Sequence, residues 1–152
     1  MEQYFCEWTD DTPLILMDAN KGVFLISGKC IPKEPIEFFT PIIEWVERYV
    51  QKPNDDTRLV FDLNYFNVAS PRYIMRIINQ LHLILEQGKS VSIYWIHEQN
   101  DLDLKEAGLD FAGISKIPFA FFEKPNNEDP LEVNKLLAYA DGLDNAYLLQ
   151  NY

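Results

Sequence analysis

Short apolar runs of strand length alternate with segments of helical periodicity along most of this 152-residue chain. Two runs, at 14–18 and 23–27, are separated by the turn-forming sequence Asp-Ala-Asn-Lys-Gly and predict an antiparallel hairpin. Three further runs, at 58–63, 91–96 and 119–122, predict buried strands. Strands that alternate with helices pair in parallel through right-handed crossovers. We therefore expect an α/β fold: a single-domain mixed β-sheet with an N-terminal hairpin and with helices packed on it.

Three segments between these strands carry the period of an amphipathic helix. The first covers about 36–51 and contains Pro41, which lacks a backbone N–H, so this helix either kinks there or begins at Thr40. The second starts at residues 70–71, Ser-Pro, because serine can cap a helix and proline suits its first turn. A third, short helix is expected at 101–111.

The C-terminal part has a different composition. Residues 124–128 predict a linker, 129–142 predict a short helix with a capping pattern at its start, and 146–152 form an apolar tail. We therefore divide the chain into a domain at 1–123 and a C-terminal helical extension at 124–152.

The charge balance narrows the classes of function. The chain has 13 Lys+Arg against 24 Asp+Glu, a formal net charge of −11. An acidic protein is repelled by phosphate backbones and by anionic lipid surfaces, so we expect no nucleic-acid partner and no membrane partner. The N-terminal residues carry no secretory signal pattern, and no apolar run is long enough to span a bilayer. Cys6 and Cys30 form no redox or metal motif, and the sequence leaves open whether they pair. We expect a cytoplasmic protein.

Few side chains are arranged for catalysis. The two histidines accompany no nucleophile motif, and the six glycines form no nucleotide-binding loop, so we expect no enzyme activity, no cofactor and no metal. Acidic residues crowd the start of the helix at 101–111, where they favour the helix dipole and lack the spacing of an EF-hand. Two alternatives remain: a structural interaction domain without a switch, and a small metal-binding or enzymatic protein that uses His97, Glu98, Asp101 and Asp103.

The segment from 61 to 70 runs from a predicted strand into a helix start and ends on the hydroxyl of Ser70. A phosphate placed there would meet unpaired backbone N–H groups and the positive end of the helix dipole. It would also add nearly two negative charges to an acidic surface, which can expel a partner. The segment is therefore either a phosphorylation switch or a plain helix cap, and local physics alone favours the cap.

Several separated motifs occur in a fixed order between about residues 12 and 121. They lie at 26–32, 38–41 with Trp45, 65–67, Trp95, 101–103, 106–108 with Phe111, and 118–119. Together they resemble the SiaC family of bacterial regulatory phosphoproteins. The resemblance implies a fold similar to the STAS-type anti-sigma-factor antagonists and a non-enzymatic, partner-switching role.

The resemblance also implies the partners. In this family a kinase phosphorylates a threonine at the strand-to-helix turn, and a metal-dependent phosphatase removes the phosphate. The unphosphorylated form binds and activates a diguanylate cyclase, which raises cyclic di-GMP and promotes aggregation or biofilm formation. For this chain we therefore expect a diguanylate cyclase, a cognate serine/threonine kinase and a metal-dependent phosphatase as partners.

This chain departs from the family at the turn itself. Val68 stands where the family usually has the threonine that accepts phosphate, and valine has nearly the same shape but no hydroxyl. Either Ser70 has become the phosphoacceptor, or the switch is fixed in its unphosphorylated form. We favour the second, because an acceptor moved by two residues reaches different backbone N–H groups.

The candidate site has two parts. We define the switch turn as the five residues that precede Ser70, namely Tyr65, Phe66, Asn67, Val68 and Ala69. The partner-binding candidates are two arginines on the polar face of the second predicted helix and three acidic residues of the third, namely Arg72, Arg76, Asp101, Asp103 and Glu106.

Overall fold

The computed structural model describes residues 1–126, 135, 136 and 138. In this part of the chain one sheet contains β1 (Tyr4–Cys6), β2 (Leu14–Asp18), β3 (Val23–Cys30), β4 (Asp56–Phe66), β5 (Ser90–Glu98) and β6 (Phe119–Lys124). The later strands are connected by the helices α1 (Pro35–Tyr49), α2 (Ser70–Glu86) and α3 (Leu102–Ser115). The predicted alternation of strands and helices is confirmed.

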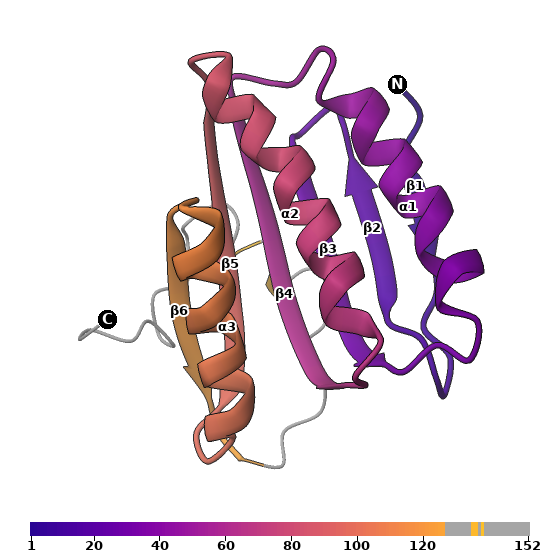
Figure 1. Ribbon diagram of the computed structural model, residues 1–152, viewed down its shortest axis with the longest axis vertical. Helices are drawn as coiled ribbons and strands as arrows, with labels where there is room; N and C mark the ends of the chain where they lie inside the picture. Colours follow the sequence, from indigo (N-terminus) through magenta and orange to yellow (C-terminus); the bar gives the residue numbers. More distant parts are fainter. Residues whose placement is uncertain (127–134, 137, 139–152) are drawn as a thin grey trace.

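The strands lie side by side in the same order as in the chain (Figure 1). β1, β2 and β3 pair antiparallel, whereas β3, β4, β5 and β6 pair parallel, which confirms the mixed sheet and its N-terminal hairpin. β1 was not predicted, because three residues are too few to show an alternating pattern. It pairs with β2 in register from Tyr4 opposite Met17 to Cys6 opposite Ile15.

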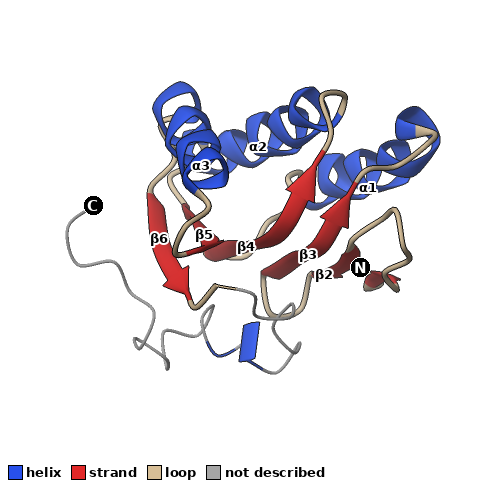
Figure 2. Cartoon of the chain, turned by 90° about the horizontal axis from the view of Figure 1, so that it is seen from below, coloured by secondary structure: helices blue, strands red, loops and turns tan. Residues whose placement is uncertain are grey.

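All three helices cover the same face of the sheet (Figure 2). Each crossover leads from one strand to its neighbour in the same direction, and right-handed crossovers of that kind leave their helices on one side. We call this the helical face; it holds the larger core, with Phe24, Phe39, Phe61, Ile77 and Trp95 among its buried residues. We call the opposite face the back face; its buried cluster consists of Leu14, Leu16, Val23, Leu25, Val60, Ile96, Phe122 and Leu136.

Pro41 lies inside α1, which begins at Pro35 and not at Thr40. Pro35 lies in the first turn of the helix, where a backbone N–H has no partner within the helix, so the N–H that proline lacks costs no hydrogen bond. Pro41 leaves the carbonyl of Glu37 without its helical donor, but Glu37 is exposed, so water can reach that carbonyl. The neighbouring Thr40 hydroxyl donates a hydrogen bond to the carbonyl of Ile36 (2.6 Å). The amphipathic pattern thus determines the extent of this helix despite the proline.

The C-terminal predictions lie mostly outside the described residues. Of the predicted helix at 129–142, Lys135, Leu136 and Ala138 are described, and all three are helical. The tail at 146–152 is outside the described part. The predicted linker is wrong at its first residue, because Lys124 ends β6. The division into two parts stays a prediction. None of the described helices is long and apolar enough to span a membrane.

Candidate functional site

The switch turn lies at the carboxyl edge of the parallel strands. Tyr65 and Phe66 end β4, and residues 67–69 lead into α2. Because β3, β4 and β5 run parallel, their carboxyl ends and the N-termini of the helices that follow them gather at this edge, the lower one in Figure 1. We call it the carboxyl edge. Open α/β sheets typically bind their ligands at such an edge.

Hydrogen bonds hold the base of the turn against the end of β3. The N–H of Asn67 donates to the carbonyl of Cys30 (3.1 Å), and the N–H of Ser70 donates to the carbonyl of Asn67 (3.2 Å). The Ser70 hydroxyl lies 2.7 Å from Oδ1 of Asn67 and 3.1 Å from the carbonyl of Cys30, and both oxygens accept. The base of the turn is therefore fixed by contacts to a strand forty residues earlier in the chain.

Ser70 does not cap α2 as predicted. The N-cap residue is Ala69, and no side chain caps the helix there. Ser70 is the first helical residue, and its side chain is 0% exposed because it is turned toward Cys30 and Asn67. Pro71 lies in the first turn, as predicted. The hydroxyl that the sequence offers as a phosphoacceptor is thus enclosed in the core in this conformation.

The tip of the turn has the opposite environment. Val68 is 102% exposed, and Tyr65 is 58% exposed. The intervening Phe66 and Asn67, and Ala69 beyond the tip, are half-buried. Position 68, which the resemblance predicts to be the family's phosphoacceptor position, is therefore fully accessible, although valine has no hydroxyl.

The thiol of Cys30 belongs to the base of the turn. Burial raises the pKa of Cys30 to about 11, and the hydrogen bond with the Ser70 hydroxyl offsets a part of that shift. The sulfur lies 3.6 Å from the Ser70 oxygen. The thiolate is the reactive form of cysteine, so this buried thiol is inert at neutral pH. Cys6 is also free, so the described structure has no disulfide between the two.

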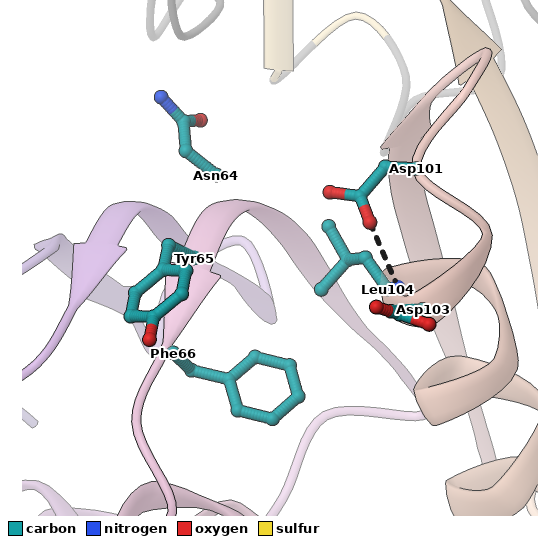
Figure 3. Close-up of a pocket in the computed structure, with 6 residues that line it drawn as sticks. All are labelled: Asn64, Tyr65, Phe66, Asp101, Asp103 and Leu104. Carbon is teal, nitrogen blue, oxygen red and sulfur yellow. Dashed lines mark hydrogen bonds between the residues drawn. The ribbon is translucent and has the colours of Figure 1, made fainter.

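A pocket of about 390 Å³ opens beside the switch turn (Figure 3). Its lining comes from the end of β4 and the start of α3, namely Asn64, Tyr65, Phe66, Asp101, Asp103 and Leu104. Two of the predicted partner-binding residues, Asp101 and Asp103, are thus brought next to the turn. Asp101 also caps α3, because its Oδ1 accepts a hydrogen bond from the N–H of Leu104 (3.1 Å).

Asn64 lines the pocket but is not among the residues that the sequence predicts for the site. It lies in a β-bulge of β4. Gly28 of β3 pairs with Leu63, whereas the next residue, Lys29, pairs with Tyr65, so Asn64 is the extra residue of β4. Its Oδ1 is buried and has no hydrogen-bond partner in the described structure. A polar residue inside an apolar strand is the signal that could have indicated the irregularity. The bulge changes the alternation at the end of β4, where Tyr65 is exposed.

Trp95 positions the other wall of the pocket. Its indole N–H donates a hydrogen bond to the carbonyl of Leu104 in α3 (2.9 Å). Gly108 lies against the same ring, and a Cβ at this position would come within 2.5 Å of it. This close approach explains why a tryptophan in β5 and a glycine in α3 occur together among the recognised motifs. It also fixes the start of α3, which carries Asp101 and Asp103, against the sheet.

The other candidate residues are separate from this pocket. Arg72 and Arg76 are both exposed on α2 and share one side of it, as their four-residue spacing predicts. Glu106 is exposed on α3. None of the three lines the pocket.

The alternative cluster around His97 is not assembled as a metal site. His97 is 2% exposed, and its Nδ1 lies 2.9 Å from the carbonyl of Glu98. Asp101 is used as a helix cap, and Asp103 lines the pocket with Tyr65. Among the described residues, no group of three or more His, Cys, Asp or Glu side chains is placed to hold an ion.

Comparison with known proteins identifies the family. The family described as SiaC family regulatory phosphoprotein matches residues 6–124. The chain belongs to the SiaC family. This membership confirms the resemblance derived from the separated sequence motifs.

Solved SiaC structures have the same fold. Apo-SiaC from Pseudomonas aeruginosa is 27% identical with a TM-score of 0.72, and the match covers 80% of this chain and 98% of that one. A second solved structure contains the P. aeruginosa diguanylate cyclase SiaD in complex with its activator SiaC. This chain matches it with 26% identity and a TM-score of 0.75, over 80% of this chain and 99% of that one. An uncharacterized protein of P. aeruginosa strain UCBPP-PA14 is 29% identical over 112 residues, 74% of this chain and 89% of the relative. The α/β fold class is confirmed, while the likeness to STAS domains stays a prediction.

Proposed function

We propose that this SiaC-family chain is a non-enzymatic regulator that binds and activates a diguanylate cyclase through its carboxyl edge while it is unphosphorylated. The observation that best supports this proposal is the exposed apolar tip of the switch turn. Val68 and Tyr65 project from it, and Leu102 at the start of α3 is also exposed (65%). Exposed apolar groups that gather at one edge are typical of protein interaction sites. The solved SiaC that activates SiaD supports the choice of partner.

The charged candidates fit the rim of such an interface. Asp101 and Asp103 lie at the pocket next to Tyr65, and Glu106 follows them on α3. Arg72 and Arg76 are exposed on the helix that the switch turn begins. Rim charges steer association and select the partner more than they add affinity. We assign these charges to the polar rim of the interface and the apolar tip to its centre, which is the usual arrangement of such surfaces.

The regulation of this chain differs from that of a threonine switch. Val68 offers no hydroxyl to a kinase, and the Ser70 hydroxyl is 0% exposed. The cognate kinase and the metal-dependent phosphatase therefore act on this chain only if the start of α2 opens. We thus favour a switch that is fixed in the cyclase-binding form. A cytoplasmic location belongs to the same proposal, and two free cysteines accord with a reducing compartment.

Intact-mass spectrometry after incubation with a SiaC-family kinase tests the acceptor. We expect no adduct on the parent chain and one phosphate on Val68→Thr, because the position is accessible and only the hydroxyl is missing. Val68→Ala is the matched control, since it changes the same side chain without adding a hydroxyl. A phosphate on the parent chain that disappears in Ser70→Ala would overturn the fixed switch and make Ser70 the acceptor.

Cyclic di-GMP synthesis by a SiaD-type cyclase tests the binding surface. We expect the parent chain to stimulate synthesis with or without the kinase, and phosphorylated Val68→Thr to lose this effect. Tyr65→Ala should raise the half-maximal concentration at least about tenfold, as aromatic anchors of interfaces commonly do. Ile114→Ala, which alters an apolar residue that is slightly more exposed than Tyr65 and lies near the C-terminal end of α3, is the control. Absence of stimulation by the parent chain with every SiaD-type cyclase tried contradicts the proposal.

A further inference from the structure

The back face of the sheet is buried although no helix of the α1–α3 layer covers it. Leu25 is 0% exposed, Val60 is 1% exposed and Ile96 is 0% exposed. Side chains alternate along a strand, so these residues point away from the helices that cover their neighbours. Neighbouring strands alone do not remove such side chains from water. Something else in the chain must therefore lie over this face.

Leu136 identifies what lies there. It is 1% exposed and belongs to the same buried cluster as the sheet residues of the back face. Among the described residues it is the member of that cluster that comes from outside the sheet. The short helical piece that contains it lies beneath the sheet, opposite the three helices (Figure 2).

A buried ion pair marks the same face. Nζ of Lys124 lies 2.8 Å from Oδ1 of Asp62, and the two side chains are 1% and 0% exposed. Asp62 follows Val60 by two residues and Lys124 follows Phe122 by two, so both side chains point to the back face. An ion pair that is this well buried on a sheet face requires a cover that excludes water. The pair is therefore a second buried feature of the back face, in addition to the contact of Leu136.

We propose that the back face is a docking surface for the chain's own segment 127–152, which binds it intramolecularly with Leu136 as the anchor. The sequence pattern supports this occupant, because Val133, Leu136 and Ala140 recur at helical spacing. The family match ends at residue 124, and solved SiaC chains are matched almost completely by 80–82% of this chain. The segment is thus an addition to the family fold. Any other protein that binds this face must first displace it.

Thiol labelling of the full chain tests this docking. In a Cys6→Ser background, Val60→Cys places a thiol on the back face and Val91→Cys places one on the helical face; both valines are buried. Each probe is compared with and without Leu136→Asp. We expect Leu136→Asp to raise the labelling rate of Val60→Cys at least about tenfold and to leave Val91→Cys nearly unchanged, because a charged anchor cannot stay in the apolar cluster.

Two further variants serve as controls for the effect of Leu136→Asp on labelling. Leu136→Ala is milder and should accelerate the labelling of Val60→Cys by an intermediate factor. Ile114→Asp introduces the same charge at an exposed position and should change neither rate. An unchanged rate for Val60→Cys, or equal acceleration of both probes, would overturn the proposal. Protection of Val60→Cys that appears only at high protein concentration would assign the face to a second copy and would also overturn it.

Discussion

The two faces of the sheet are buried by different means. The helical face packs against three helices through a dense aromatic and aliphatic core, in which Phe24 meets Trp45 edge to face and Phe39 stacks on Tyr73. The back face has a smaller apolar cluster, a buried ion pair and a contact from Leu136. The helical face supports the switch turn and the pocket, whereas the back face carries neither. The proposed binding surface therefore lies on the side of the helical face, and Leu136, which lies beyond the family match, contacts the other face.

The largest expected effect on stability comes from the buried ion pair of the back face. Lys124→Met leaves the carboxylate of Asp62 without its lysine in a dry environment, and should lower the free energy of unfolding by about 3–5 kcal/mol. The double variant Asp62→Leu with Lys124→Met removes both charges and should recover most of that loss. Urea unfolding of the three proteins measures both effects. A single variant as stable as the parent would mean that water reaches the pair.

A leucine-to-alanine substitution on each face measures how tightly the two faces are packed. Leu59 on the helical face and Leu25 on the back face are both 0% exposed. We expect Leu59→Ala to cost about 3–5 kcal/mol and Leu25→Ala about 2–3 kcal/mol, because a cavity in the smaller cluster of the back face can collapse further than one in the larger core beneath three helices. Thermal and urea unfolding give both values. The reverse order would show that the back face is the more rigidly packed one.

The smallest effect depends on pH and concerns the helical face beneath the switch turn. The pKa of Cys30 is raised by burial from 9.0 to about 11, so the folded state holds its proton more tightly than the unfolded chain. This contribution is fully present below pH 9 and is lost as the pH rises toward 11. It amounts to about 2–3 kcal/mol. We expect the stability of the parent chain to fall more steeply over this range than that of Cys30→Ala, measured by urea unfolding. Equal slopes would contradict the burial of the thiol.

The sequence predicted most of the elements because local periodicity specifies them. The hairpin, the three helices and the parallel strands all have patterns that one segment displays by itself. β1 was missed because Tyr4–Cys6 is too short for any pattern. The start of α1 was left open because Pro41 is unfavourable in a helix, and the packing of its apolar face outweighs that penalty.

The candidate site was predictable in composition but not in geometry. The turn at 65–69 and the acidic start of α3 follow from local sequence. The burial of Ser70 does not, because its hydroxyl is held by Cys30, which is distant in the chain. The pocket likewise depends on the bulge at Asn64 and on the contact of Trp95 with α3. Such features arise only when separate elements pack together.

The order of the strands also has a consequence for how the protein is made. Each strand pairs with the strand that precedes it in the chain, so the sheet can grow by successive addition as the polypeptide leaves the ribosome. Each helix can close over the helical face as soon as the next strand has been added. Leu136 leaves the ribosome after all six strands. The back face is therefore the last apolar surface of the nascent chain to be protected, and the one most exposed to aggregation during synthesis.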